Sequence, residues 1–221
     1  MKAPVHRLKK IEIIWLANNY CKVHKHDYLQ HYSCFLKENP NQERVGFLDI
    51  EASNLDADFG IMLSYCIKDA NSSKIWEGIV DKKGLDKYLD KQVVTKCIED
   101  MQKFDRVVTY YGMRFDLPFI RTRSIVHGID FPNYSSLVHT DVYFMARNKL
   151  KLSSNRLENV SRIVLGETNK TRIDAKYWVK ALRGDKKSLN YILEHNRYDV
   201  IDLEKVYNKL LNFSNKTNTS I

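Results

Sequence analysis

Three short apolar runs lie close together in the first half of the chain, and only turn-forming stretches separate them. They cover residues 45–50, 61–67 and 75–80, and the connections between them are rich in Asn, Asp and Ser. Strands joined by such short connections pair antiparallel, because a parallel pair needs a long crossover. This stretch therefore predicts a three-stranded antiparallel meander.

After Gly84 the apolar period changes to that of a helix. Helical patterns over residues 85–101 and 117–126 alternate with apolar runs over residues 106–110 and 138–142. A strand reached through a helix is expected to run parallel to the strand before it. Asn155 and Glu158 predict a capping box for a helix over residues 156–165 that Gly166 ends, and Asp185 is expected to cap a last helix.

This order of elements predicts an α/β fold. The expected sheet is mixed and five-stranded, with three antiparallel strands plus two parallel ones, and helices flank it. It would occupy residues 45–213, between an N-terminal extension over residues 1–44 and a Ser-, Asn- and Thr-rich flexible tail over residues 214–221. In the extension, a helix is predicted over residues 7–19.

Composition narrows the class of protein. The chain has no apolar run long enough to span a membrane and no signal-peptide pattern, and its four Cys do not suggest a disulfide framework. We therefore expect a cytoplasmic protein without membrane contact, and take a monomer as the starting assumption.

The positive charge is concentrated in one stretch. The formal net charge is +9, and residues 145–187 hold 12 Lys or Arg against 4 acids. A basic stretch inside a folded domain is typical of proteins that bind a polyanion, although a solvated lysine-rich surface gives the same composition.

Asp49 and Glu51 lie two residues apart at the end of the first predicted strand, so both point to the same side. Two neighbouring carboxylates repel each other unless a cation lies between them. Mg²⁺ and Mn²⁺ prefer such clustered oxygen ligands. The alternative is a pair of solvated acids at the edge of a loop.

Two further motifs could join this pair. Asp116 follows the strand over residues 106–110 and opens a helix, although a role as helix N-cap would give the same pattern. His195 and Asp199 lie four residues apart and share a face of the last helix. An imidazole beside several carboxylates is a candidate general base.

Together these motifs resemble the DEDD-type (DnaQ-like) 3′–5′ exonucleases, which have the ribonuclease-H-like fold. The stretches that carry the resemblance are Asp-x-Glu at residues 49–51, Tyr-x-Gly-x-x-Phe-Asp-x-Pro-Phe at residues 110–119, and His-Asn-x-x-Asp-Val at residues 195–200. The last of these is most similar to the YprB-type ribonuclease-H-like domain. The resemblance covers residues 45–210.

The resemblance implies a metal-dependent nuclease that hydrolyses phosphodiester bonds, most simply a 3′–5′ exonuclease with two Mg²⁺ or Mn²⁺ ions. It implies that Asp49, Glu51, Asp116 and Asp199 hold the metal ions and that His195 activates a water. Asp141 lies near the fifth-strand acid of the family and is expected to support the site. His195 and Asp199 are separated as in the Tyr-type members of the family, whereas the His-type members usually have one more residue between them. An endonuclease on the same fold and a catalytically inactive nucleic-acid-binding module are the alternatives.

The expected partner is nucleic acid, DNA or RNA, as a single strand or a 3′ end. Aromatic side chains could stack on a base, and basic side chains could hold the phosphate backbone. The candidates are Tyr110, Tyr111, Arg121, Arg123, Lys149 and Lys151.

A separate pattern lies in the N-terminal extension, where Cys21 and His24 are followed by His31 and Cys34. Two Cys and two His form a common ligand set for a structural Zn²⁺. The alternative is a His-rich basic linker that contacts nucleic acid or solvent.

Overall fold

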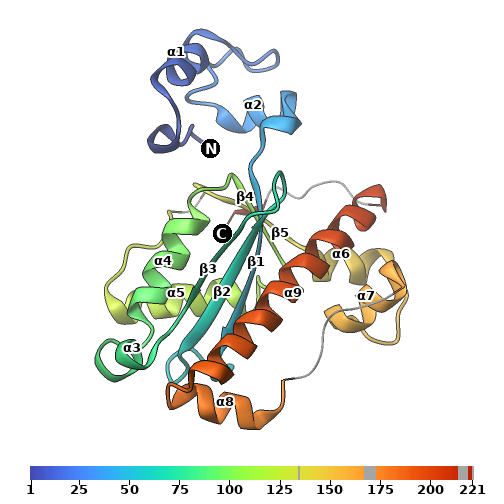
Figure 1. The fold of residues 1–221 in the computed structure, drawn as a ribbon. Helices are drawn as coiled ribbons and strands as arrows, with labels where there is room; N and C mark the ends of the chain where they lie inside the picture. The colour runs from blue at the N-terminus through green and yellow to red at the C-terminus, as the bar shows by residue number, and fades with distance from the viewer. Residues whose placement is uncertain (134, 167–172, 214–218, 221) are drawn as a thin grey trace.

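The computed structural model describes residues 1–133, 135–166, 173–213 and 219–220, and its centre is one mixed sheet (Figure 1). The strand order is β3-β2-β1-β4-β5-β6. β1, β2 and β3 pair antiparallel, whereas β4 and β5 continue the sheet parallel to β1. The predicted mixed α/β sheet is confirmed. The strands are β1 (Val45–Ala52), β2 (Met62–Asp69), β3 (Ile75–Ile79), β4 (Arg106–Thr109), β5 (Val138–Asp141) and β6 (Thr219–Ser220).

β6 is a strand that the sequence does not predict. It pairs antiparallel with β5, with Ser220 opposite Val138 and Thr219 opposite His139. It lies inside the stretch expected to be a flexible tail, of which residues 214–218 and 221 lie outside the described part of the chain. The open edge of β5 offers unpaired backbone groups, and even a short segment can satisfy them.

Helices cover the sheet, and α9 extends along it in Figure 1. α7 ends at Gly166, whose φ of 82° is the left-handed conformation predicted there, and Asp185 caps α9 as predicted. The predicted capping box at α7 is wrong, because the N-cap is Arg156. The helices are α3 (Lys82–Lys87), α4 (Lys91–Met101), α5 (Asp116–His127), α6 (Val142–Lys149), α7 (Leu157–Leu165), α8 (Ala175–Leu182) and α9 (Lys186–Leu210), followed by the 3-10 turn η3 (Leu211–Phe213).

The alternation of β1 decides which side chains meet α9. Leu48 and Ile50 belong to the apolar cluster that includes the buried residues of α4 and α5. Phe47 belongs to the other cluster, which contains Leu203 and Leu210 of α9. Since alternate residues of a strand share a face, Asp49 and Glu51 follow Phe47 on the side of α9.

Residues 1–44 form a lobe of their own at one end of the sheet (Figure 1). It contains η1 (Val5–Arg7), α1 (Lys10–Asn18), α2 (Tyr32–Glu38) and η2 (Pro40–Gln42). Asp105, just before β4, ties the lobe to the sheet by accepting hydrogen bonds from the Arg7 guanidinium at 2.7 Å and the Arg44 backbone N–H at 2.9 Å. Among the described residues, no helix is both long and apolar enough to cross a membrane.

Candidate metal-binding and nucleic-acid site

Three of the four predicted metal ligands come together where α9 crosses β1. Asp49 and Glu51 of β1 and Asp199 of α9 each offer a carboxylate oxygen, and these oxygens lie within 4.8 Å of one another. Asp199 is buried, whereas the two strand acids are half-buried. The cluster brings together residues about 150 positions apart in the sequence, and it is open to solvent on the side of the strand acids.

Asp116 approaches the same strand from α5. Its buried carboxylate accepts a hydrogen bond from the backbone N–H of Ile50 at 3.0 Å, between the two strand acids. The N-cap of α5 is Phe115, so Asp116 is the first helical residue and does not cap the helix with its side chain. The N-cap alternative is therefore wrong, and the carboxylate is directed toward β1.

Asn196 is a site residue to which sequence reasoning gave no role. Its side-chain N–H donates to the Asp49 carboxylate at 2.6 Å, and its carbonyl oxygen accepts from the Ser64 hydroxyl of β2 at 3.2 Å. Asn196 is fully buried, so this chain of hydrogen bonds holds Asp49 in one orientation. The sequence signal for a role at the site was its position three residues before Asp199, which places both residues on the same face of the helix.

His195 is buried on α9, one turn before Asp199. Its Nδ1 lies 2.9 Å from the Tyr191 carbonyl oxygen, and its ring packs at 4.3 Å from the Tyr191 ring. Because a carbonyl oxygen only accepts, Nδ1 carries the proton and the lone pair of the neutral imidazole lies on Nε2.

An aromatic pocket of about 600 Å³ adjoins Asp49. Its lining includes Tyr110, Tyr111, Tyr143 and residues 153–158. The Tyr111 ring is exposed and lies 4.6 Å from the Tyr143 ring, whereas the Tyr110 hydroxyl donates to the Asn155 carbonyl at 2.6 Å. Tyr111 is thus available for contact, and Tyr110 forms part of the pocket wall.

The turn that presents Tyr111 is held by Asp141. The Asp141 carboxylate accepts hydrogen bonds from the backbone N–H groups of Tyr111, Met113 and Tyr143, at 2.8, 3.0 and 3.0 Å. Burial raises the pKa of Asp141, and these hydrogen bonds act against that rise. Gly112 is required inside the turn, because a Cβ there would lie 2.3 Å from the Thr109 hydroxyl oxygen.

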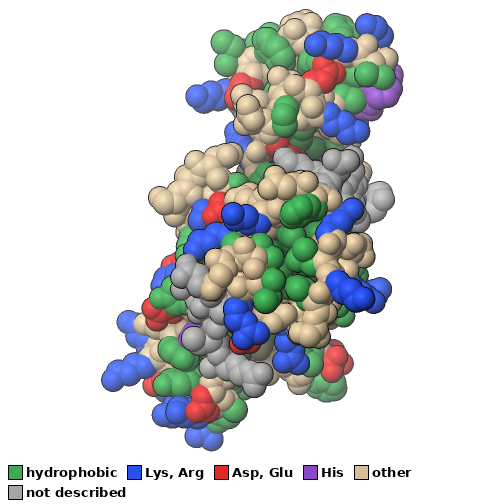
Figure 2. Space-filling model, turned by 90° about the vertical axis from the view of Figure 1, so that its right-hand side faces the viewer, with side chains coloured by type: hydrophobic (Ala, Val, Ile, Leu, Met, Phe, Trp, Pro, Cys, Tyr) green, Lys and Arg blue, Asp and Glu red, His purple; other side chains and the backbone are tan. Residues whose placement is uncertain are grey.

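Of the basic side chains predicted to contact nucleic acid, some are exposed and one is buried. Arg121, Lys149 and Lys151 are exposed, and Arg156 at the rim of the aromatic pocket joins them. Figure 2 shows Lys and Arg side chains spread over the face of the molecule that carries α6 and α7.

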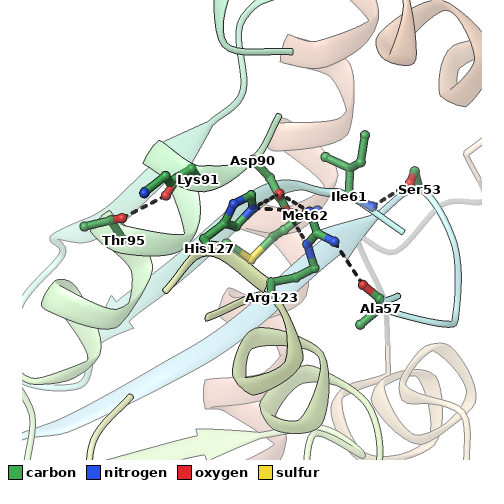
Figure 3. Close-up of polar contacts among 9 residues, drawn as sticks. All are labelled: Ser53, Ala57, Ile61, Met62, Asp90, Lys91, Thr95, Arg123 and His127. Carbon is green, nitrogen blue, oxygen red and sulfur yellow. Dashed lines mark hydrogen bonds and ion pairs between the residues drawn. The ribbon is translucent and has the colours of Figure 1, made fainter. Parts of the chain in front are cut away.

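Arg123 is buried, and its guanidinium points toward Asp90 and Ala57 (Figure 3). Its guanidinium donates to both oxygens of the Asp90 carboxylate, at 2.6 and 2.9 Å, and to the Ala57 carbonyl at 3.1 Å. His127 contacts the same carboxylate at 2.7 Å. These contacts occupy the guanidinium inside the fold, so Arg123 is removed from the candidate nucleic-acid surface.

The four N-terminal Cys and His side chains also come together. One ligand atom of each of Cys21, His24, His31 and Cys34 lies within 4.8 Å of the others. This second cluster belongs to the lobe, whereas the carboxylates lie on the domain built around the sheet.

The sequence profile of the RNase_H superfamily matches residues 46–211. The chain belongs to this superfamily. This confirms the resemblance to a ribonuclease-H-like domain of the YprB type, and the match covers β1 through α9, including all four acids.

Two DNA polymerases are similar to parts of the chain. A DNA polymerase of Methanocaldococcus jannaschii is 27% identical over an alignment of 152 residues that covers 56% of this chain and 9% of that protein. A solved family B DNA polymerase from Pyrobaculum calidifontis superposes with a TM-score of 0.61 and 18% identity, covering 77% of this chain and 25% of the polymerase. The structural match shows the fold, and the chain spans only a small part of the length of each polymerase.

Proposed function

We propose that this chain is a metal-dependent nuclease that hydrolyses phosphodiester bonds, most simply as a 3′–5′ exonuclease. The observation that carries the proposal is the cluster of Asp49, Glu51 and Asp199 in a domain of the RNase_H superfamily. The similarity to two DNA polymerases favours nucleic acid as the substrate class.

The donor set fits hard divalent cations. Carboxylate oxygens this close together repel one another, and burial of Asp199 strengthens the repulsion. Mg²⁺ or Mn²⁺ would remove the repulsion, with Asp49, Glu51, Asp199 and the adjoining Asp116 as ligands. Bound metal ions of this kind stabilise charge on a phosphoryl group and lower the pKa of water.

The residues around the carboxylates have two roles, which are to orient a metal ligand and to accept a proton. The Asn196 amide fixes the Asp49 carboxylate, and Ser64 in turn fixes the amide. His195 is proposed to accept the proton of the attacking water at Nε2, because the Tyr191 carbonyl keeps the other proton on Nδ1.

The substrate would approach across the aromatic pocket. The exposed Tyr111 ring, supported by Tyr143, offers a surface on which a terminal base could stack. Lys149, Lys151 and Arg156 lie on or just before the segment that lines this pocket and would contact phosphates. Arg121 is exposed on α5 and remains a candidate for the same role.

End-labelled oligonucleotides test both the activity and its direction. Single- and double-stranded DNA and RNA, labelled at the 5′ or the 3′ end, are incubated with Mg²⁺ or Mn²⁺. A 3′–5′ exonuclease shortens the 5′-labelled strand stepwise and releases the 3′ label as a mononucleotide. Internal products of defined length would indicate an endonuclease, and binding without cleavage of any substrate would favour the inactive binding module.

A further inference from the structure

We propose that the N-terminal lobe binds one structural Zn²⁺ through the Sγ atoms of Cys21 and Cys34 and the Nδ1 atoms of His24 and His31. This site lies wholly within the lobe and does not depend on nuclease activity. Four side chains of the types that Zn²⁺ prefers converge there, with their ligand atoms within 4.8 Å of one another.

The distances within the cluster match a tetrahedral zinc site. With Zn–S of about 2.3 Å and Zn–N of about 2.0–2.1 Å, a tetrahedron places sulfur and nitrogen about 3.5 Å apart. The His24 Nδ1 atom lies 3.5 Å from Cys21 Sγ and 3.4 Å from Cys34 Sγ, and His31 Nδ1 lies 3.2 Å from Cys34 Sγ.

The backbone holds the first ligand pair in a tight turn. The N–H of Lys25 donates to the Cys21 carbonyl at 3.0 Å, the N–H of Cys21 donates to the His26 carbonyl at 2.9 Å, and Lys25 has a φ of 59°. The N–H of His24 donates to Cys21 Sγ at 3.0 Å. This last contact would stabilise negative charge on a thiolate, which is the form that binds metal.

The second pair lies at the start of α2. His31 is the N-cap of this helix, and Cys34 is in its first turn, with the Cys34 N–H donating to the His31 carbonyl at 2.9 Å. A separation of three residues directs both side chains to the same face of a helical turn. The two pairs therefore face each other across the lobe.

The core of the lobe is too small to explain its fold by apolar burial alone. Two of the side chains buried there are the cysteines themselves, and the others are Ala3, Leu16, Tyr28, Tyr32 and Leu36. Units of about 40 residues usually need a disulfide or a metal in addition to their core. A Zn²⁺ ion would join the turn at Cys21 to α2 and close this core.

The location favours a structural role. The lobe leads into the first residue of β1, whereas Asp49 and Glu51 lie toward the other end of that strand. The proposed site has four protein ligands, and closed sites of this kind are structural, since catalytic zinc keeps a position open.

His26 provides a matched control within the same turn. It is exposed, and its ring lies 5.1 Å from the His31 ring, yet it does not belong to the cluster of four. His26→Ala should therefore retain the metal, whereas Cys34→Ser and His24→Ala should lose it.

Metal content and Co²⁺ absorption of the full chain test the site directly. We expect about one zinc per chain from reduced protein purified without chelator, and intense visible absorption with thiolate-to-cobalt charge transfer after exchange for Co²⁺. An Asp49→Asn, Asp199→Asn double variant should keep both signals. Retention of the cobalt spectrum in Cys34→Ser, or its loss in the double carboxylate variant, would place the metal elsewhere and overturn the proposal. Failure of the reduced wild-type chain to take up Zn²⁺ or Co²⁺ would also overturn it.

Discussion

His195 has a geometry that suits a general base, because the Tyr191 carbonyl fixes its tautomer. We expect His195→Ala to lower the maximal cleavage rate by about two to four orders of magnitude. The Mn²⁺ concentration that gives half-maximal rate should change little, since the carboxylates remain. Rates measured over a Mn²⁺ titration check this. Near wild-type turnover at saturating metal would end the assignment of His195 as the base.

His139 makes stability depend on pH. It is buried beside Arg106 and contacts the Thr109 hydroxyl at 2.8 Å, and its burial, together with the Arg106 charge, lowers its pKa to about 4. Above the ordinary value of about 6.5, both folded and unfolded states are neutral at this side chain. Below it, the unfolded state takes up a proton first. The free energy of unfolding therefore decreases as the pH is lowered from about 6.5 to about 4.

Between pH 7 and pH 5 this effect should cost about 2 kcal/mol of unfolding free energy. His139→Gln removes the titrating group and keeps a hydrogen-bonding partner for Thr109. Urea unfolding of both proteins at the two pH values should show that the wild type loses more stability than the variant by about this amount. Equal losses in the two proteins would contradict the assigned role.

Single residues also show where sequence reasoning succeeds and fails. Asp49 and Glu51 could be located from local alternation alone, because strand geometry fixes their common side. The roles of Asn196 and Arg123 depend on partners 132 and 33 residues away, Ser64 and Asp90. No local pattern contains such pairs, so an arginine next to a motif was predicted to contact substrate although it forms a buried ion pair.

At the scale of elements, the Asp90–Arg123 ion pair joins the start of α4 to α5 (Figure 3). Burial alone would raise the pKa of Asp90, but hydrogen bonds from Arg123, His127 and the Met62 N–H outweigh it and lower the pKa. Arg123→Met leaves the Asp90 charge buried without its main partner. We expect a loss of about 3–5 kcal/mol in unfolding free energy.

The neighbouring Arg121 gives the matched control for this prediction. It is exposed on the same helix, and its guanidinium lies 5.1 Å from the Phe131 ring. Arg121→Met should change stability by about 0.5 kcal/mol or less. Chemical denaturation compares the two variants, and similar stabilities would refute the importance of the ion pair.

The elements themselves were predictable where a local signal marks their ends. Gly166 and Asp185 fix the end of α7 and the start of α9 by backbone conformation and capping. α6 and α8 were not predicted, although Asp141 and Asp174 cap them. Each has only eight residues, so its apolar period is too short to separate it from a loop.

At the scale of the whole molecule, excess positive charge should make nucleic-acid binding depend on salt. Each phosphate contact to a single strand contributes about −0.7 to the slope of log K against log salt. In a Lys149→Gln, Lys151→Gln double variant, the magnitude of the slope of log K against log salt should therefore be smaller by about 1.4 if both side chains contact phosphates. Binding is measured by fluorescence anisotropy with Ca²⁺ and a labelled single strand. An unchanged slope would remove this segment from the binding surface.

The overall architecture was predictable because the order of strand and helix periods restricts the possible sheets. The structure of the N-terminal lobe was less predictable, because its core depends on contacts between α1 and α2 that a single amphipathic pattern does not specify. The sequence predicts a helix over residues 7–19, with Ile11 and Trp15 on its apolar stripe. The observed α1 is shorter and buries Leu16, whereas Ile11 is exposed and Trp15 half-exposed, stacked on Tyr28.

The cleavage rate of Asp199→Asn is the most direct test of the proposed carboxylate centre. The substitution removes one charge of the carboxylate cluster and keeps the size of the buried Asp199 side chain, so the fold should remain and its stability should not fall. Single-turnover cleavage of a labelled oligonucleotide with Mn²⁺ is compared among the wild type, Asp199→Asn and Glu99→Gln, an exposed acid of α4 that serves as control. We expect Mn²⁺-dependent cleavage by the wild type and Glu99→Gln, and a loss of at least about 100-fold in folded Asp199→Asn. Cleavage by Asp199→Asn at the wild-type rate, or none by the wild type on any DNA or RNA substrate, would contradict it.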